Sequence, residues 1–151
     1  MTETQKTNKP FPIVPVIIVI LVVGLIGSRF KSKTNDIAKI TTKEGQVVVS
    51  EEKGLAWPTD LPINIPKYDS GKIKAYSHLE GQTAWTMIIS DTNEEYFKNY
   101  KEALKKEAWV ESSEMMTVVS IVSMKKDGYD INVVWDASSN GALITLSKTL
   151  K

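Results

Sequence analysis

Candidates for catalysis are few in this chain. His78 is the only histidine, and cysteine is absent. A hydrolytic triad would need His78 as the general base of an activated serine, but no serine stands in a nucleophile-elbow sequence. Without thiols, a metal site would depend on carboxylates, and these show no calcium-loop spacing. The sequence therefore predicts no catalytic residue, metal site or cofactor, so we expect that the protein is not an enzyme.

The four tryptophans are the other candidates, because indole rings line sugar-binding platforms and protein interfaces. Trp85 and Trp135 alternate with polar neighbours, which predicts that both side chains are packed in a core. Trp57 and Trp109 lack this alternation. For these two residues, core packing and a candidate interaction surface both remain open.

Charge is distributed unevenly along the chain. Residues 1–54 hold 8 Lys/Arg against 5 Asp/Glu, whereas residues 55–151 hold 11 against 13. A domain that is close to neutral and slightly acidic lacks the basic surface with which proteins bind nucleic acid. We therefore expect no nucleic-acid partner.

Residues 11–28 are predicted to be a transmembrane anchor, with the lipid bilayer as partner. The run from Phe11 to Gly27 carries no charge and has lysine or arginine on both sides. Its length is close to the minimum of about 17 residues for a membrane-spanning helix. A cleaved signal peptide is an alternative, but small residues match the cleavage positions poorly. A buried core segment is the other alternative, and an uncleaved signal-anchor fits best.

Gly24 and Ser28 form a small-xxx-small pair in this segment. Such pairs let two membrane helices approach closely. They predict weak self-association through this side of the anchor.

The rest of the chain predicts a short tail, a tether and one folded domain. Residues 1–10 form the tail, residues 29–54 a basic tether with a short hairpin, and residues 55–151 an α+β domain. Three prolines at 58, 62 and 66 predict an extended segment laid over this domain.

Alternating apolar residues predict the strands of this domain. They cover 72–79, 83–90, 115–124, 129–136 and 142–147. Asp127 and Gly128 predict a tight hairpin turn. An amphipathic helix is expected over 93–108, with a capping box that begins at Thr92. The predicted fold class is therefore α+β: an N-terminal transmembrane helix, then an antiparallel sheet (β-β-α-β-β-β) with one helix packed on one face.

Several of these motifs together resemble small domains of exported bacterial and archaeal lipoproteins of unknown function. The motifs are a hairpin at 43–49, the W-P-x-D-x-P segment at 57–62, the Gly-Lys-Ile at 71–73, and a helix with Tyr96, Tyr100, Leu104 and Trp109. The chain lacks the lipid-bearing cysteine of such proteins, so a transmembrane anchor would replace the lipid. The resemblance implies a domain outside the cytoplasm and supplies no catalytic residues.

These observations predict a membrane-anchored, noncatalytic envelope protein whose domain binds a protein or a cell-wall component. The alternative is an accessory or regulatory subunit of a membrane complex, with the domain in the cytoplasm. Arg29, Lys31 and Lys33 follow the apolar segment and favour the cytoplasmic side. The resemblance and the absence of cysteine favour the outside. We expect a single-pass protein of the cell membrane with an extracytoplasmic C-terminal domain.

The anchor can be tested by alkaline carbonate extraction of membranes that contain the 151-residue chain. We expect the chain to stay in the membrane pellet at its full mass, because the uncharged run at 11–27 has no good cleavage site after it. Release of a shortened, soluble form would contradict this prediction.

Overall fold

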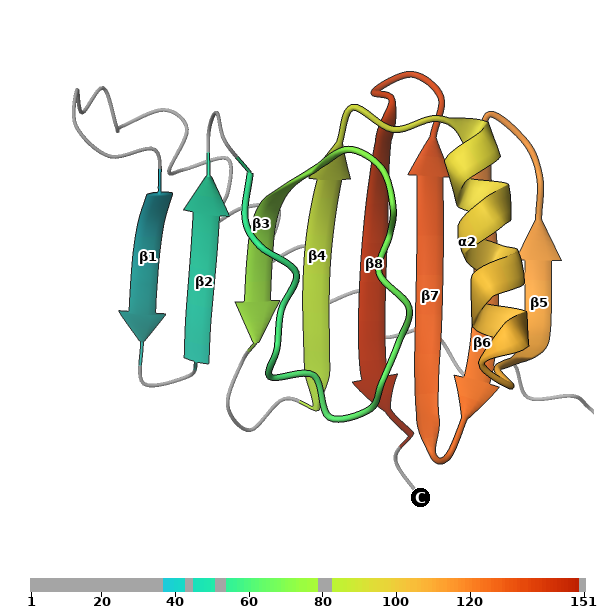
Figure 1. Cartoon of the computed structure of the whole chain (residues 1–151), viewed down its shortest axis with the longest axis horizontal. Coiled ribbons are helices and arrows are strands. Elements are labelled where there is room, and N and C mark those ends of the chain that lie inside the picture. The colour runs from blue at the N-terminus through green and yellow to red at the C-terminus, as the bar shows by residue number, and fades with distance from the viewer. Residues whose placement is uncertain (1–36, 43–44, 51–53, 79–82, 150–151) are drawn as a thin grey trace, which may run out of the picture. The chain divides into compact units, whose positions relative to one another are not determined.

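One antiparallel sheet contains every strand that the structure describes. The structure is a computed structural model that describes residues 37–42, 45–50, 54–78 and 83–149. Its elements are β1 (Ile37–Thr42), β2 (Gly45–Ser50), β3 (Lys72–His78), β4 (Ala84–Ser90), α2 (Glu94–Lys106), β5 (Val110–Met115), β6 (Val119–Lys126), β7 (Tyr129–Asp136) and β8 (Gly141–Lys148). The eight strands lie in the order β1-β2-β3-β4-β8-β7-β6-β5 (Figure 1).

The predicted fold class is wrong in the number and the order of its strands. The described chain reads β-β-β-β-α-β-β-β-β, not β-β-α-β-β-β. The hairpin predicted as part of the tether belongs to the main sheet, because β2 pairs with β3 from Gln46↔His78 to Val49↔Ala75. A lone hairpin is marginal in water, and this pairing gives its strands a sheet to extend.

The predicted strand over 115–124 is also wrong, because this run contains a chain reversal. Strand β5 ends at Met115 and β6 begins at Val119, and the two strands pair in a hairpin. Thr117 supplies local hydrogen bonds for the reversal: its Oγ1 donates to the Val119 carbonyl oxygen (2.8 Å) and accepts from the Val119 N–H (3.3 Å). Such a side chain lets a turn form inside an apolar run that otherwise favours a strand.

The transmembrane part of the predicted fold class has no counterpart in the described structure. In the ranges given above, no helix is both long and apolar enough to cross a membrane. The predicted tail at 1–10, the anchor at 11–28 and the Gly24/Ser28 pair all lie outside the described residues.

Helix α2 forms close to its predicted position, but its cap differs from the prediction. Asn93, not Thr92, is the N-cap residue, and its Oδ1 accepts a hydrogen bond from the Tyr96 N–H at 3.1 Å. The Thr92 hydroxyl donates instead to the Tyr68 hydroxyl oxygen at 3.0 Å. Acidic residues in the first turn and lysines in the last turn complement the helix dipole.

The core lies between one face of the sheet and two covering segments. Helix α2 contributes the buried side chains Phe97, Tyr100 and Leu104. The extended segment 54–71, which we call the strap, contributes Ile65 and Tyr68, with Trp57, Leu61 and Ile63 packed against the core. Figure 1 shows the strap in front of β3, β4 and β8, and α2 on the same side of the sheet in front of β6 and beside β7. The prolines therefore mark a segment that lies extended over the domain, as predicted.

Two glycines with left-handed backbone differ in what surrounds them. Gly128 follows Asp127 in the β6–β7 turn, and both have positive φ (78° and 49°), as a type I′ hairpin requires. A Cβ at Gly128 would meet nothing within 4 Å. Gly71 ends the strap with φ 78°, and a Cβ there would lie 2.1 Å from the Ser90 carbonyl oxygen. Gly71 is therefore required for close approach as well as for its φ angle.

Substitution of these glycines separates the two effects. We expect Gly71→Ala to lower the free energy of unfolding by about 2–4 kcal/mol, because backbone strain and a clash with β4 act together. Gly128→Ala is the matched control with the same φ and no clash, and it should cost only about 1–2 kcal/mol. Urea unfolding followed by tryptophan fluorescence measures both, and equal losses would contradict this account.

Candidate functional site

The side chains best suited to acid–base chemistry meet at one end of β3. The Tyr76 hydroxyl donates to Asp60 Oδ1 of the strap at 2.7 Å. His78 Nδ1 lies 3.8 Å from Asp60 Oδ2, and the imidazole stacks on the Trp85 indole with ring centroids 4.6 Å apart. No local pattern signalled this cluster, because Asp60 is far from the other three residues along the chain.

This cluster holds the strap on the sheet. The separation between His78 and Asp60 is too long for a hydrogen bond. The pKa of Tyr76 is strongly raised, first by burial and then by its hydrogen bond to Asp60 and the charge of that carboxylate. Tyr76 is therefore a neutral phenol that donates to Asp60. Among the described residues, no serine or threonine forms a hydrogen bond with His78, so no nucleophile is paired with it.

The tryptophans belong to the core or pack against it. Trp85 and Trp135 are buried core residues, as predicted. Trp109 is 2% exposed and also belongs to the core, while Trp57 is half-buried and packs against it. Of the two candidate interaction residues, only Trp57 has side-chain area left for a partner. The interaction surface predicted at these residues stays a prediction.

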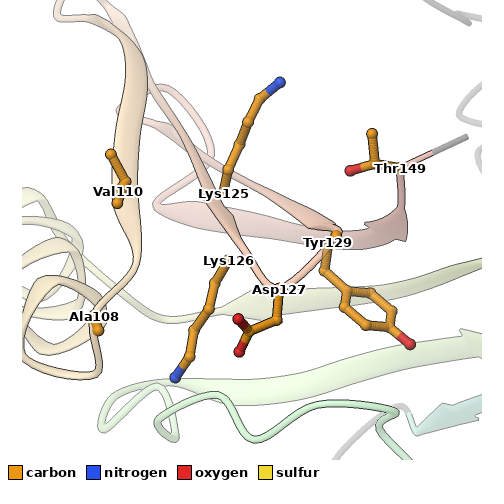
Figure 2. Close-up of a pocket in the computed structure, with 8 residues that line it drawn as sticks. Ala108, Val110, Lys125, Lys126, Asp127, Tyr129 and Thr149 are labelled. Carbon is orange, nitrogen blue, oxygen red and sulfur yellow. The ribbon is translucent and has the colours of Figure 1, made fainter. Parts of the chain in front are cut away.

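An open hollow of about 460 Å³ lies beside the β6–β7 turn (Figure 2). It is lined by Ala108, Val110, Lys125, Lys126, Asp127, Gly128, Tyr129 and Thr149. Lys126 Nζ donates to the Glu107 carbonyl oxygen, and Lys125 Nζ lies 3.4 Å from Asp130 Oδ1. Both cations are therefore paired with the protein, and the hollow lacks the convergent polar groups of a ligand site. In the described part of the chain, no group of three or more histidines and carboxylates could hold a metal ion.

Strand β5 is an edge strand that is protected against pairing with another chain. Its register shifts between Glu111 and Ser113, so a bulge interrupts the ladder. Lys105 Nζ lies 3.2 Å from Glu111 Oε2, and Lys101 of α2 pairs with Glu114. The hydrogen bond from Lys105 is the main reason that the pKa of Glu111 is lowered. Charged side chains and bulges both disfavour edge-to-edge association.

The second face of the sheet carries two regular rows of uncharged side chains. We call the first the apolar row; its cross-strand partners from β2 to β6 are Val49, Ala75, Ile88, Leu143, Val134 and Ile121. The second, the polar row, runs from β3 to β6 through Ser77, Thr86, Thr145, Asn132 and Ser123, and Val47 lies next to it on β2. Together the two rows define the open face. Because side chains alternate along a strand, this face is opposite to the core.

Neither α2 nor the strap covers the open face. Both pack on the core side, and they are the covering segments among the residues that the structure describes. Ala75 and Ser77 are short and buried, whereas the other members of the two rows are half-buried. Large exposed apolar patches on a protein surface can mark interaction sites. The open face is therefore the candidate functional site, and alternation along each strand was the sequence signal that could have identified it.

The tie between strap and sheet can be measured with a double-mutant cycle on Tyr76→Phe and Asp60→Ala. We expect each single substitution to lower the free energy of unfolding by about 1–2 kcal/mol, because it removes a hydrogen bond to a charged group. The double substitution should cost little more than either single one, since the two side chains share that bond. Strictly additive losses would show that Tyr76 and Asp60 act independently.

Comparison of the chain with protein-family models, with curated proteins and with solved structures returned no match. The resemblance to domains of exported lipoproteins therefore stays a prediction.

Proposed function

We propose that this protein is a membrane-attached, noncatalytic module that binds another protein through the open face of its sheet. The observation that supports this proposal is the face itself. The polar row crosses five strands and the apolar row crosses six, and neither row contains a charged side chain. In the described part of the chain, no helix or extended segment covers them. Interface cores are likewise depleted in charged residues.

The composition of the open face favours a protein partner over a cell-wall polymer. Sugar-binding platforms use aromatic rings, and neither row contains one. Valine, isoleucine and leucine in one row offer apolar contact, and threonine hydroxyls in the other offer hydrogen bonds. Such a surface suits a flat, uncharged protein surface of similar composition.

Membrane attachment through the apolar segment 11–28 completes the proposal. Eight residues, 29–36, separate that segment from the start of β1 along the chain. The open face would then be available to partners in or near the bilayer, and we place the domain on the extracytoplasmic side. The positively charged residues at 29, 31 and 33 would lie beside the lipid headgroups.

Site-directed photo-crosslinking tests this function in intact membranes. The chain has no cysteine, so a benzophenone maleimide can be placed on Thr145→Cys alone. We expect that illumination links this position to a protein, because Thr145 is in the centre of the open face. Asn99→Cys, exposed on α2, is the matched control and should give a much weaker product. Equal products from both positions, or none from Thr145→Cys, would contradict the proposed function.

A further inference from the structure

The outer side of the sheet, which carries the open face, is close in size to an interface between two proteins. The six strands from β2 to β6 cover a width of about 29 Å, and their length is about 23 Å, from the usual strand spacing and rise per residue. The whole outer side of these six strands thus has a flat area of roughly 670 Å², and the two rows of the open face occupy the middle of it. A standard interface buries about 800 Å² on each partner. A partner would therefore have to cover these strands over their full length, beyond the two rows, to bury close to a standard area.

The two rows match their own copies under two-fold symmetry. The middle of the six strands lies between β4 and β8. A two-fold axis along the strands at this point would place β4 over β8, β3 over β7 and β2 over β6 of a second copy. Positions along the strands are preserved by this rotation, so the apolar row would meet the apolar row and the polar row would meet the polar row. Two sheets packed in this way form a sandwich with aligned strands, about 10 Å apart.

Free hydroxyl groups lie at the centre of this arrangement. Within the described residues, the side chains of Thr86 and Thr145 form no hydrogen bond, whereas Ser123 is bonded to Asn132 at 2.6 Å. Thr86 and Thr145 are cross-strand partners on the two central strands. The rotation would bring each of them opposite the other residue in the second copy, where a water molecule between the sheets can bridge the two hydroxyls.

Opposite charges also match under the same rotation. Lys72 of β3 is the cross-strand partner of Ser90, and Asp136 of β7 is the cross-strand partner of Gly141. Both charged side chains are on the side of the open face, at the same edge of the apolar row. Hydrogen bonds from Ser138 and then Ser139 lower the pKa of Asp136, so its carboxylate is ionised at neutral pH. With β3 over β7, Lys72 would face the Asp136 carboxylate of the second copy, and this pair would occur twice.

From these matches we infer that the partner of the open face is a second copy of this chain, packed face to face about an axis between β4 and β8. The inference rests on the proposed function and names its partner. Association by sheet edges is disfavoured at β5 by its bulge and its charged residues. A closed pair of this kind uses the same surface on both copies, as isologous dimers do.

Cross-linking between two tagged copies tests the dimer in membranes that contain the whole chain. Thr145→Cys is introduced into copies with two different tags, and a short bismaleimide is added. We expect a product of twice the 16.8 kDa chain mass that carries both tags. Asn99→Cys should give at least about tenfold less of this product, because random collision is the only source of contact at that exposed position on α2.

The charge pair tests the orientation of the two copies. Lys72→Asp should weaken the dimer about tenfold, since two favourable pairs become unfavourable. Asp136→Lys should weaken it similarly, and the two substitutions together should restore the product because the pairs are reversed. Circular dichroism of each variant verifies the fold, and Lys72→Asp, at an exposed position, gives a result even if Asp136→Lys disturbs its turn.

The outcomes separate this inference from the proposed function. Absence of the two-tag product from Thr145→Cys overturns the dimer. A double variant, Lys72→Asp with Asp136→Lys, that is folded but does not regain the cross-linked product also overturns it. If the benzophenone at Thr145 then links the chain to a different protein, the module binds another partner through the open face and the proposed function stands. If it links to no protein, both proposals fail.

Discussion

The need to cover one face of a wide sheet with very little chain governs this structure. At the usual spacing between strands, a sheet of eight strands is about 38 Å wide. Helix α2 has 13 residues, so it is about 20 Å long and roughly 10 Å wide. It can therefore cover only part of the core face, over β6 and beside β7. The strap lies over β3, β4 and β8 and adds isolated apolar side chains to the core, and three prolines keep it extended.

A strap without regular hydrogen bonds must be held by specific contacts. The Leu55 N–H donates to the Ile73 carbonyl oxygen at 2.8 Å near its beginning, and Gly71 lets the backbone approach β4 at its end. Between them, Asp60 accepts from Tyr76 beside the His78–Trp85 stack. The residues that looked most suitable for catalysis are thus explained by the attachment of the strap. Trp57 and Asp60 of the W-P-x-D-x-P segment also attach the strap, since Trp57 packs against the core and Asp60 accepts the hydrogen bond from Tyr76.

The same register that builds the core also orders the open face. Each core residue on the central strands has neighbours in the chain that point the other way, and antiparallel pairing aligns these neighbours across the sheet. At the level of the two rows the register holds from β2 to β6, and the irregularity in β3 lies between Ile73 and Ala75, so residues of one type come to lie in one row. A sheet with a single covered face leaves this array to solvent or to a partner. The face is apolar enough to favour a partner, and its symmetry indicates which one.

Local chemistry in the sequence determined several elements of this protein, whereas tertiary structure decided what local patterns could not specify. The Asp127–Gly128 turn, the amphipathic helix and the alternation of β7 depend on near neighbours, and the structure has all three. The extended character of the strap follows from its prolines, and the core positions of Trp85 and Trp135 follow from period-two alternation.

Thr117, by contrast, reverses the chain inside an apolar run because β5 pairs with β6 and forms salt bridges to α2. The 45–50 strand joins the sheet because β3 presents a free edge to it. The rows of the open face combine residues from segments as distant as Val49 and Leu143. Strand order and register come from long-range pairing, which depends on the whole sheet, so the candidate site could not be read from any one segment of the sequence.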